Sequence, residues 1–168
     1  MIEEAELENY LIISQNKFEI YLYDKSNFKI LYEKKLNFKN EYQNIDFNIL
    51  NKFLEDNIFK IEKLTSKFIK NTFLIIDNNE IFKSKIGIKK KNYKKIIDKS
   101  FLESTLTEAK ELYKQSYQDH KIMHMIIKSF LNNGNYSQAF KNDFNSNYLS
   151  LEIEFISIPN NLAFEIDK

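Results

Sequence analysis

The chain has 168 residues, with 25 lysines and arginines, 24 aspartates and glutamates, and no cysteine. This length fits one domain, or a small domain with an additional subdomain, and 43% hydrophobic residues are enough for a core. The formal net charge of +1 gives no overall electrostatic attraction to nucleic acid or to an anionic membrane. The lack of cysteine excludes disulfides and thiolate metal sites and suits a reducing compartment.

The N-terminal sequence MIEEAELENY is acidic and has neither the basic region nor the apolar region of a signal peptide. No apolar run approaches the roughly 18–20 residues that a membrane-spanning helix needs. We therefore expect a soluble cytoplasmic protein.

Residues 11–36 predict three short strands in an antiparallel meander. Apolar residues alternate with other residues in the second and third of them, which is the period of a strand. Turn-type residues, Gln15-Asn16 and then 24–27, separate the strands. The polar run 37–44 follows and is the predicted subdomain boundary.

Residues 46–69 change to a helical period, with apolar residues three and four apart and Asp46 as the N-cap. The segment FLIIDNNEIFKSKIGI then predicts two strands joined by a hairpin turn at Asp77-Asn78-Asn79. Gly87, inside the second of these strands, indicates a bulge or a close backbone approach.

Residues 98–117 predict a second helix, with Asp98 or Ser100 as the N-cap. Strands follow at 121–130 and 148–159, and 160–168 begin a further helix. The order βββ-α-ββ-α-ββ predicts an α+β fold. We expect an N-terminal antiparallel meander in residues 1–44 and, in residues 45–159, a sheet with two helices packed on one face.

Both histidines, His120 and His124, lie four residues apart in HKIMHMIIKSFLNNG. On a helix this spacing can hold zinc, but the segment predicts a strand, on which four residues span roughly 13 Å. No cysteine or carboxylate lies nearby at ligand spacing. We therefore predict no metal site, and two ordinary residues on one face of a strand that ends in a turn at Asn132-Asn133-Gly134.

A basic cluster surrounds Tyr93, and such clusters can hold phosphate backbones. The glycines, arginines and paired aromatic residues of common RNA-binding strands are missing here. The cluster is therefore either a solvated strand end, which we favour, or a patch for a polyanion or a protein partner. Its members are Lys89, Lys90, Lys91, Lys94 and Lys95.

Known catalytic motifs are missing from the sequence. Gly87 and Gly134 are the only glycines, which excludes a P-loop and a dinucleotide fingerprint. There is no G-x-S-x-G motif, and no thiol is present as a nucleophile. Since the serines and carboxylates are scattered, we expect a binding or structural role without enzymatic activity and without a cofactor.

Several short strings match a known pattern at corresponding places along the chain. The pattern has a hairpin glycine, a strand of the form I-L-H-x-I followed by Tyr, Asp and Gly, and a later returning strand. In these features the chain resembles the N-terminal part of the FtsA family of bacterial cell-division proteins, in the actin-like ATPase superfamily. The matching residues are Gly87, IMHMI at 122–126, Phe130, Asn133, Gly134 and LEIEFISIP at 151–159.

The resemblance implies subdomain 1A strands in residues 1–44 and an inserted strand–helix–strand–strand domain, 1C, in residues 45–159. In that family the inserted domain contacts other division proteins and neighbouring protomers. Where the family carries a D-x-G-S-S-K phosphate loop, this chain has Ile12-Ile13-Ser14-Gln15-Asn16-Lys17. A hydrophobic side chain cannot hold Mg²⁺, and Ser is a poor substitute for Gly where backbone approaches phosphate.

The sequence also stops before the family's second phosphate loop, its adenosine pocket and its membrane helix, as a piece of a longer chain would. We predict a non-catalytic protein-interaction module of an FtsA-like protein, located at the inner face of the membrane through its partners. Exposed sheet edges suit such contacts. One alternative is the N-terminal part of an actin-like nucleotide-binding protein with a degenerate phosphate loop. A weaker one is nucleic-acid binding through the lysine cluster.

Overall fold

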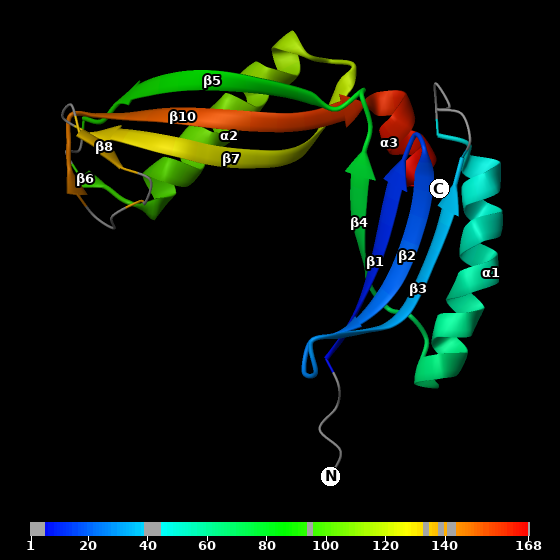
Figure 1. Ribbon diagram of the computed structural model, residues 1–168. Coiled ribbons are helices and arrows are strands. Elements are labelled where there is room, and N and C mark those ends of the chain that lie inside the picture. Colours follow the sequence, from blue (N-terminus) through cyan, green and yellow to red (C-terminus); the bar gives the residue numbers. More distant parts are fainter. Residues whose placement is uncertain are drawn as a thin grey trace. The chain divides into compact units, whose positions relative to one another are not determined.

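The computed structural model describes residues 6–38, 45–93, 96–132, 135–137, 140 and 144–167. The chain divides into two compact units, Met1–Asn79 and Glu80–Lys168. Each unit has a β-sheet with one long helix beside it (Figure 1). The predicted α+β class is confirmed, and the long elements follow the predicted order of strands and helices.

The first unit is a four-stranded sheet in the order β3-β2-β1-β4. The first three strands form the predicted antiparallel meander, and β4 pairs with β1 in parallel. Helix α1 packs on β2 and β3, and no helix from the described residues of this unit lies on the other face of the sheet. The elements are β1 Leu7–Ser14, β2 Lys17–Asp24, β3 Lys29–Asn37, α1 Phe47–Thr65 and β4 Thr72–Asp77.

Helix α1 begins where the sequence predicts it, because the Asp46 carboxylate accepts the N–H groups of Asn48 and Ile49. It ends earlier than predicted, at Ser66, whose φ of 53° is left-handed and closes the helix. Phe68 therefore lies beyond the helix and is exposed.

The predicted boundary at residue 44/45 and the predicted hairpin at 77–79 are both wrong. Strand β4 pairs with β1, and the next strand, β5 (Phe82–Lys91), pairs with a strand of the other unit. Asp77-Asn78-Asn79 thus ends one unit, and the division falls between Asn79 and Glu80. Strand β4 belongs with the meander because it pairs with β1, and α1 belongs with it because it packs on β2 and β3; turn residues encode neither contact.

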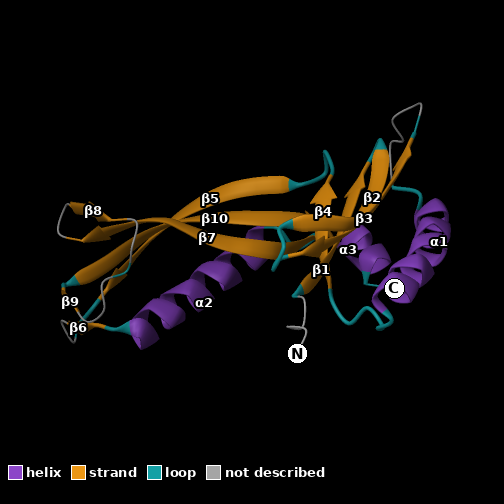
Figure 2. Ribbon diagram, turned by 60° about the horizontal axis from the view of Figure 1, so that its bottom comes forward, coloured by secondary structure: helices purple, strands orange, loops and turns teal. Residues whose placement is uncertain are grey.

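The second unit is an antiparallel four-stranded sheet in the order β5-β10-β7-β8, with a small β6-β9 pair. Helix α2 lies along one face of β5, β10 and β7 (Figure 2). Its N-cap is Asp98, which accepts the N–H of Phe101. The elements are β6 Ile96–Ile97, α2 Lys99–Ser116, β7 His120–Asn132, β8 Asn135–Ser137, β9 Phe144–Asn145, β10 Tyr148–Pro159 and α3 Asn160–Ile166.

Tyr113 of α2 occupies the centre of this unit's core. It is fully buried, its ring stacks on Phe155 with centroids 4.5 Å apart, and its hydroxyl lies 2.6 Å from that of Ser157. The two long helices are therefore divided between two sheets, instead of sharing one face of a single sheet as predicted. In the described part of the chain, no helix has the length and apolar character needed to cross a membrane.

Candidate interaction surfaces

The predicted lysine cluster is split between the two faces of the second sheet. Because side chains alternate along β5, Lys89 and Lys91 lie on the face away from α2, and Lys90 lies on the α2 side. Lys90 Nζ is 2.8 Å from a Glu108 carboxylate oxygen and donates to Ser104 Oγ at 3.2 Å. Lys90 thus fastens the strand to the helix and is unavailable as part of a basic patch. The other two members, Lys94 and Lys95, lie outside the described residues.

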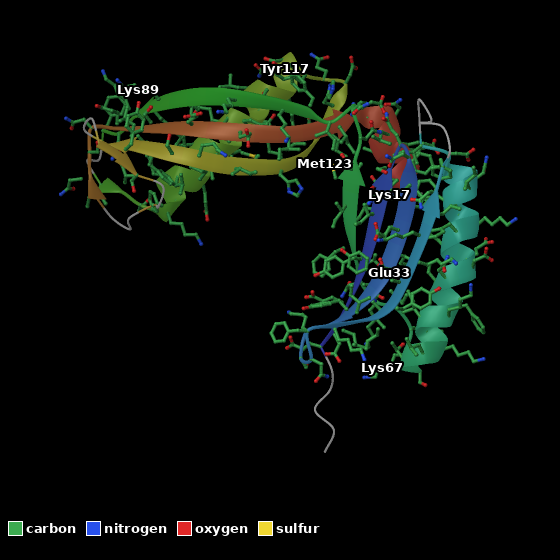
Figure 3. All side chains as sticks on the ribbon, in the orientation of Figure 1. Lys17, Glu33, Lys67, Lys89, Tyr117 and Met123 are labelled. Atoms are coloured by element: carbon green, nitrogen blue, oxygen red, sulfur yellow. The ribbon has the colours of Figure 1, made fainter. Side chains whose placement is uncertain are left out.

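Lysines line the remaining open face of this sheet along β5. Lys89 lies near one end of the strand (Figure 3). Its Nζ is 4.2 Å from the centre of the Tyr148 ring. Lys85 pairs with Glu152 of β10 at 3.5 Å. Lys91 is exposed and forms no ion pair with any residue that the structure describes. This open face therefore has more positive than negative charge along β5.

Gly87 occupies a regular position in this row, opposite Glu152 of β10. A Cβ built on Gly87 would meet no atom within 4 Å. The expectation of a bulge or a close approach at this glycine is therefore wrong. The bulges of the sheet lie between β10 and β7 instead, where the register shifts twice.

One of these bulges separates the two histidines. Ile156 pairs with His124 and Ser157 with Ile122, so Met123 is the extra residue. His124 therefore points to the open face, whereas His120 lies on the α2 side with its ring 5.6 Å from that of Phe82. The expectation that both occupy one face is wrong. Among the described residues, no three acidic or histidine side chains come together as a possible metal site.

The turn between β1 and β2 stands where the resemblance places a phosphate loop. Ser14 Oγ accepts the Lys17 N–H at 3.1 Å and donates to Asn16 Oδ1 at 2.7 Å. Because β1 and β4 are parallel, the C-terminal ends of both strands meet here. Gln15 donates a hydrogen bond to the Asn78 side chain and accepts one from the Asn79 side chain. The polar side chains of the turn are thus used to close it and to fix it to the end of β4.

A compact charge cluster borders this turn on the face of the first sheet that α1 leaves open. The Glu19 carboxylate is buried and lies 3.1 Å from Lys17 Nζ and 2.8 Å from Lys35 Nζ, and Lys35 also pairs with Glu33 of β3. Figure 3 labels Lys17 and Glu33. Burial alone would raise the pKa of Glu19, but the hydrogen bonds from Lys35 and Lys17 outweigh it and lower that pKa. The hydrogen bonds of Lys35 to Glu19 and, next in size, to Glu33 raise the pKa of Lys35. The cluster is held in its charged form.

Beside the cluster, three aromatic rings cross the open face of the first sheet, and we call them the aromatic ladder. Tyr21 of β2 stacks on Tyr10 of β1 at 5.1 Å between centroids, and Tyr10 stacks on Phe73 of β4 at 5.2 Å. The ladder leads from the middle of the sheet to its edge, where Phe73 is 53% exposed.

Strand β4 is an edge strand with large apolar side chains exposed on both of its faces. Besides Phe73, Leu74 on the α1 face is 39% exposed and Ile75 on the open face is 43% exposed. The sequence predicts this segment only as one strand of a hairpin. A continuous apolar run such as FLII is typical of parallel strands, whereas a hairpin strand with one solvated face alternates, so this signal could have indicated the parallel pairing of β4 with β1.

Comparison with known proteins adds no family assignment. The sequence matches no protein-family model, and no curated protein matches it.

Proposed function

We propose that this chain is a non-catalytic protein-interaction module that binds its partners by strand addition at β4. The observation that supports the proposal is the run Phe73, Leu74 and Ile75, exposed on an edge strand. Proteins normally shield such edges with charges, prolines or bulges, because unpaired backbone beside apolar side chains pairs readily with another chain. An added strand would satisfy this backbone and cover the apolar side chains.

The place of this module in the cell rests on sequence resemblance. The strings IMHMI at 122–126 and LEIEFISIP at 151–159 resemble those of FtsA-like proteins, and they form β7 and β10, which pair with each other. We propose that the chain acts in bacterial cell division, on the cytoplasmic side, where its partners are other division proteins or neighbouring protomers.

The proposal is tested by cross-linking the tagged chain in bacterial cells and identifying the linked proteins by mass spectrometry. Division proteins or the chain itself should be recovered with the wild type and lost with Phe73→Glu. Phe59→Glu, at an exposed aromatic residue of α1, is the matched control and should change nothing. Recovery of no partner and no self-link, or equal recovery with Phe73→Glu, would reject the proposal.

The alternative of a nucleotide-binding protein requires that the β1–β2 turn bind the phosphates of a nucleotide. A bound nucleotide would have to compete with the hydrogen bonds that Ser14 makes to Asn16 and Lys17. We therefore expect millimolar ATP with Mg²⁺ to leave the melting temperature unchanged. A rise would favour the actin-like alternative, because a ligand that binds only the folded state stabilises it.

Nucleic-acid binding is a second candidate, favoured by Lys89 and Lys91 on the open face of the second sheet. If they contact phosphates, retention on a heparin column should fall with salt, and Lys89→Glu with Lys91→Glu should abolish it. Lys90→Glu is not a useful control because Lys90 holds α2. Lys110→Glu on the exposed side of that helix is suitable. Retention that survives the double variant would count against this surface.

A further inference from the structure

Strand β4 has a sequence that is complementary to itself when two copies run antiparallel. Its odd-numbered residues Phe73, Ile75 and Asp77 lie on the open face of the sheet, and Leu74 lies on the α1 face. A basic residue, Lys70, precedes the strand, and an acidic one, Asp77, ends it. Both the apolar and the charged residues can therefore be matched by a second copy of the same strand.

We propose that two copies of this chain associate through antiparallel pairing of β4 with β4, so that one continuous sheet runs through both copies. This inference rests on the proposed function and names the partner as a second copy of the chain. A two-fold axis perpendicular to the sheet relates the copies, so each contact occurs twice.

The register follows from the pattern of side chains. A two-fold axis perpendicular to the sheet keeps each side chain on its own face. Residues directly opposite each other in an antiparallel pair also share a face, so the axis must place one residue of β4 opposite the same residue of the second copy. Centring it at Leu74 places Phe73 of each copy opposite Ile75 of the other, which is a favourable aromatic–β-branched pair. Centring it at Ile75 would place Phe73 opposite Asp77, a carboxylate against an apolar ring. The pairing through Leu74 is therefore the register that we expect.

The charged ends agree with this register. With Leu74 at the axis, Asp77 of one copy lies opposite Asn71 of the other, next to Lys70. The amide and the ammonium group are both suitable partners for the carboxylate. A parallel arrangement would instead bring Asp77 beside Asp77, and like charges at close range oppose association.

The open face gains a longer apolar row from this pairing. The aromatic ladder of each copy ends at Phe73, which would contact Ile75 of the other copy. Six residues of β4 make a small interface, however. Interfaces well below about 1,200 Å² of buried area belong to transient complexes. We therefore expect a reversible dimer that dissociates on dilution.

The test uses sedimentation velocity on the full chain over a wide concentration range. The wild type should show a concentration-dependent monomer–dimer equilibrium. Phe73→Glu and Ile75→Lys should each weaken it by on the order of tenfold or more, because each places two charges against apolar side chains in the symmetric dimer. Mixing the two variants should restore association. In the mixed dimer one Glu faces one Lys, and the second pair is the native Phe73 with Ile75.

This restoration is specific to the register centred at Leu74. Another register would leave the new Glu and Lys apart, so a mixture that stays as weak as the single variants would overturn the proposal. A wild type that remains monomeric at every concentration would do so as well. Phe59→Glu should dimerise like the wild type, and far-UV circular dichroism of each variant establishes that it is folded.

The dimer and the proposed function can fail separately. A monomeric chain whose cross-linking to a division protein depends on Phe73 would reject the dimer and keep the interaction module, with a partner's strand on β4. A dimer that follows the predicted pairing, without links to division proteins, would keep the interface and reject the division role.

Discussion

Removing the hydroxyl of Tyr113 should destabilise the second unit by about 1–2 kcal/mol. This hydroxyl lies 2.6 Å from Ser157 Oγ, and both residues are fully buried. Tyr113→Phe keeps the ring and its stack on Phe155. The loss of stability therefore comes from the broken hydrogen bond and from the Ser157 hydroxyl, which stays buried without this partner. Ser157 Oγ also donates to the Phe82 carbonyl oxygen at 3.5 Å, a distance at which hydrogen bonds are weak.

Ser157→Ala should have a similar cost, because it leaves the Tyr113 hydroxyl buried without its partner. The double variant should then be more stable than the sum of the single changes predicts, since it leaves neither hydroxyl unpaired. We expect a coupling free energy of about 1 kcal/mol between the two positions.

Urea unfolding followed by far-UV circular dichroism gives these free energies, with tyrosine fluorescence as a second probe in a chain that has no tryptophan. Tyr136→Phe removes a hydroxyl from an exposed tyrosine of the same unit and should leave the stability unchanged. Strict additivity of Tyr113→Phe and Ser157→Ala would refute the reasoning, because it would mean that the two hydroxyls do not interact.

Three further predictions concern single residues. Asp46→Ala should lower stability by about 1 kcal/mol by removing the cap of α1, whereas Asp56→Ala on the exposed side of the helix should not; equal urea midpoints would contradict this. The lowered pKa of Glu19 means that its stabilisation is present above the ordinary value of 4.5 and is lost as the pH falls through the lowered one. Glu19→Gln should therefore flatten the decline of the melting temperature in acid, and an unchanged slope would contradict the assigned ion pairs. Gly87→Ala should raise stability by about 0.5 kcal/mol, because the new Cβ meets no atom within 4 Å; a loss would indicate a close approach.

Local features of the fold could be predicted because local chemistry determines them. Asp46 and Asp98 are N-caps as expected, since a carboxylate before a helix accepts N–H groups that have no other partner. The alternation of apolar residues placed β2 correctly, because a sheet with one covered face requires it. In β3 the alternation predicted for Phe28, Ile30 and Tyr32 is wrong: Phe28 lies in the turn before the strand, and a register shift opposite Leu22 and Tyr23 puts Ile30 and Tyr32 on opposite faces.

Pairing partners and faces could not be predicted in the same way. Asp77-Asn78-Asn79 has the composition of a hairpin turn, which predicts that β4 pairs with β5. Strand β4 pairs with β1 instead, and no local sequence feature encodes which strand becomes its neighbour. Likewise, a bulge at Met123 places the histidines on opposite faces, and alternation along β5 assigns Lys90 to the helix. The lysine cluster, continuous in sequence, is therefore divided in space.

The edges of the two sheets give the strongest argument that β4 is an interface. Strand β3, the other edge of the first sheet, carries charged side chains at Lys29 and Glu33. Strand β5, an edge of the second sheet, carries several lysines that point to the open face of that sheet. Charged side chains, lysine above all, are the usual protection of an edge against pairing with another chain. Strand β4 has no charge between Thr72 and Ile76. A chain that is rich in lysine, yet has none in this strand, lacks this protection at one edge, as expected if β4 pairs with another strand.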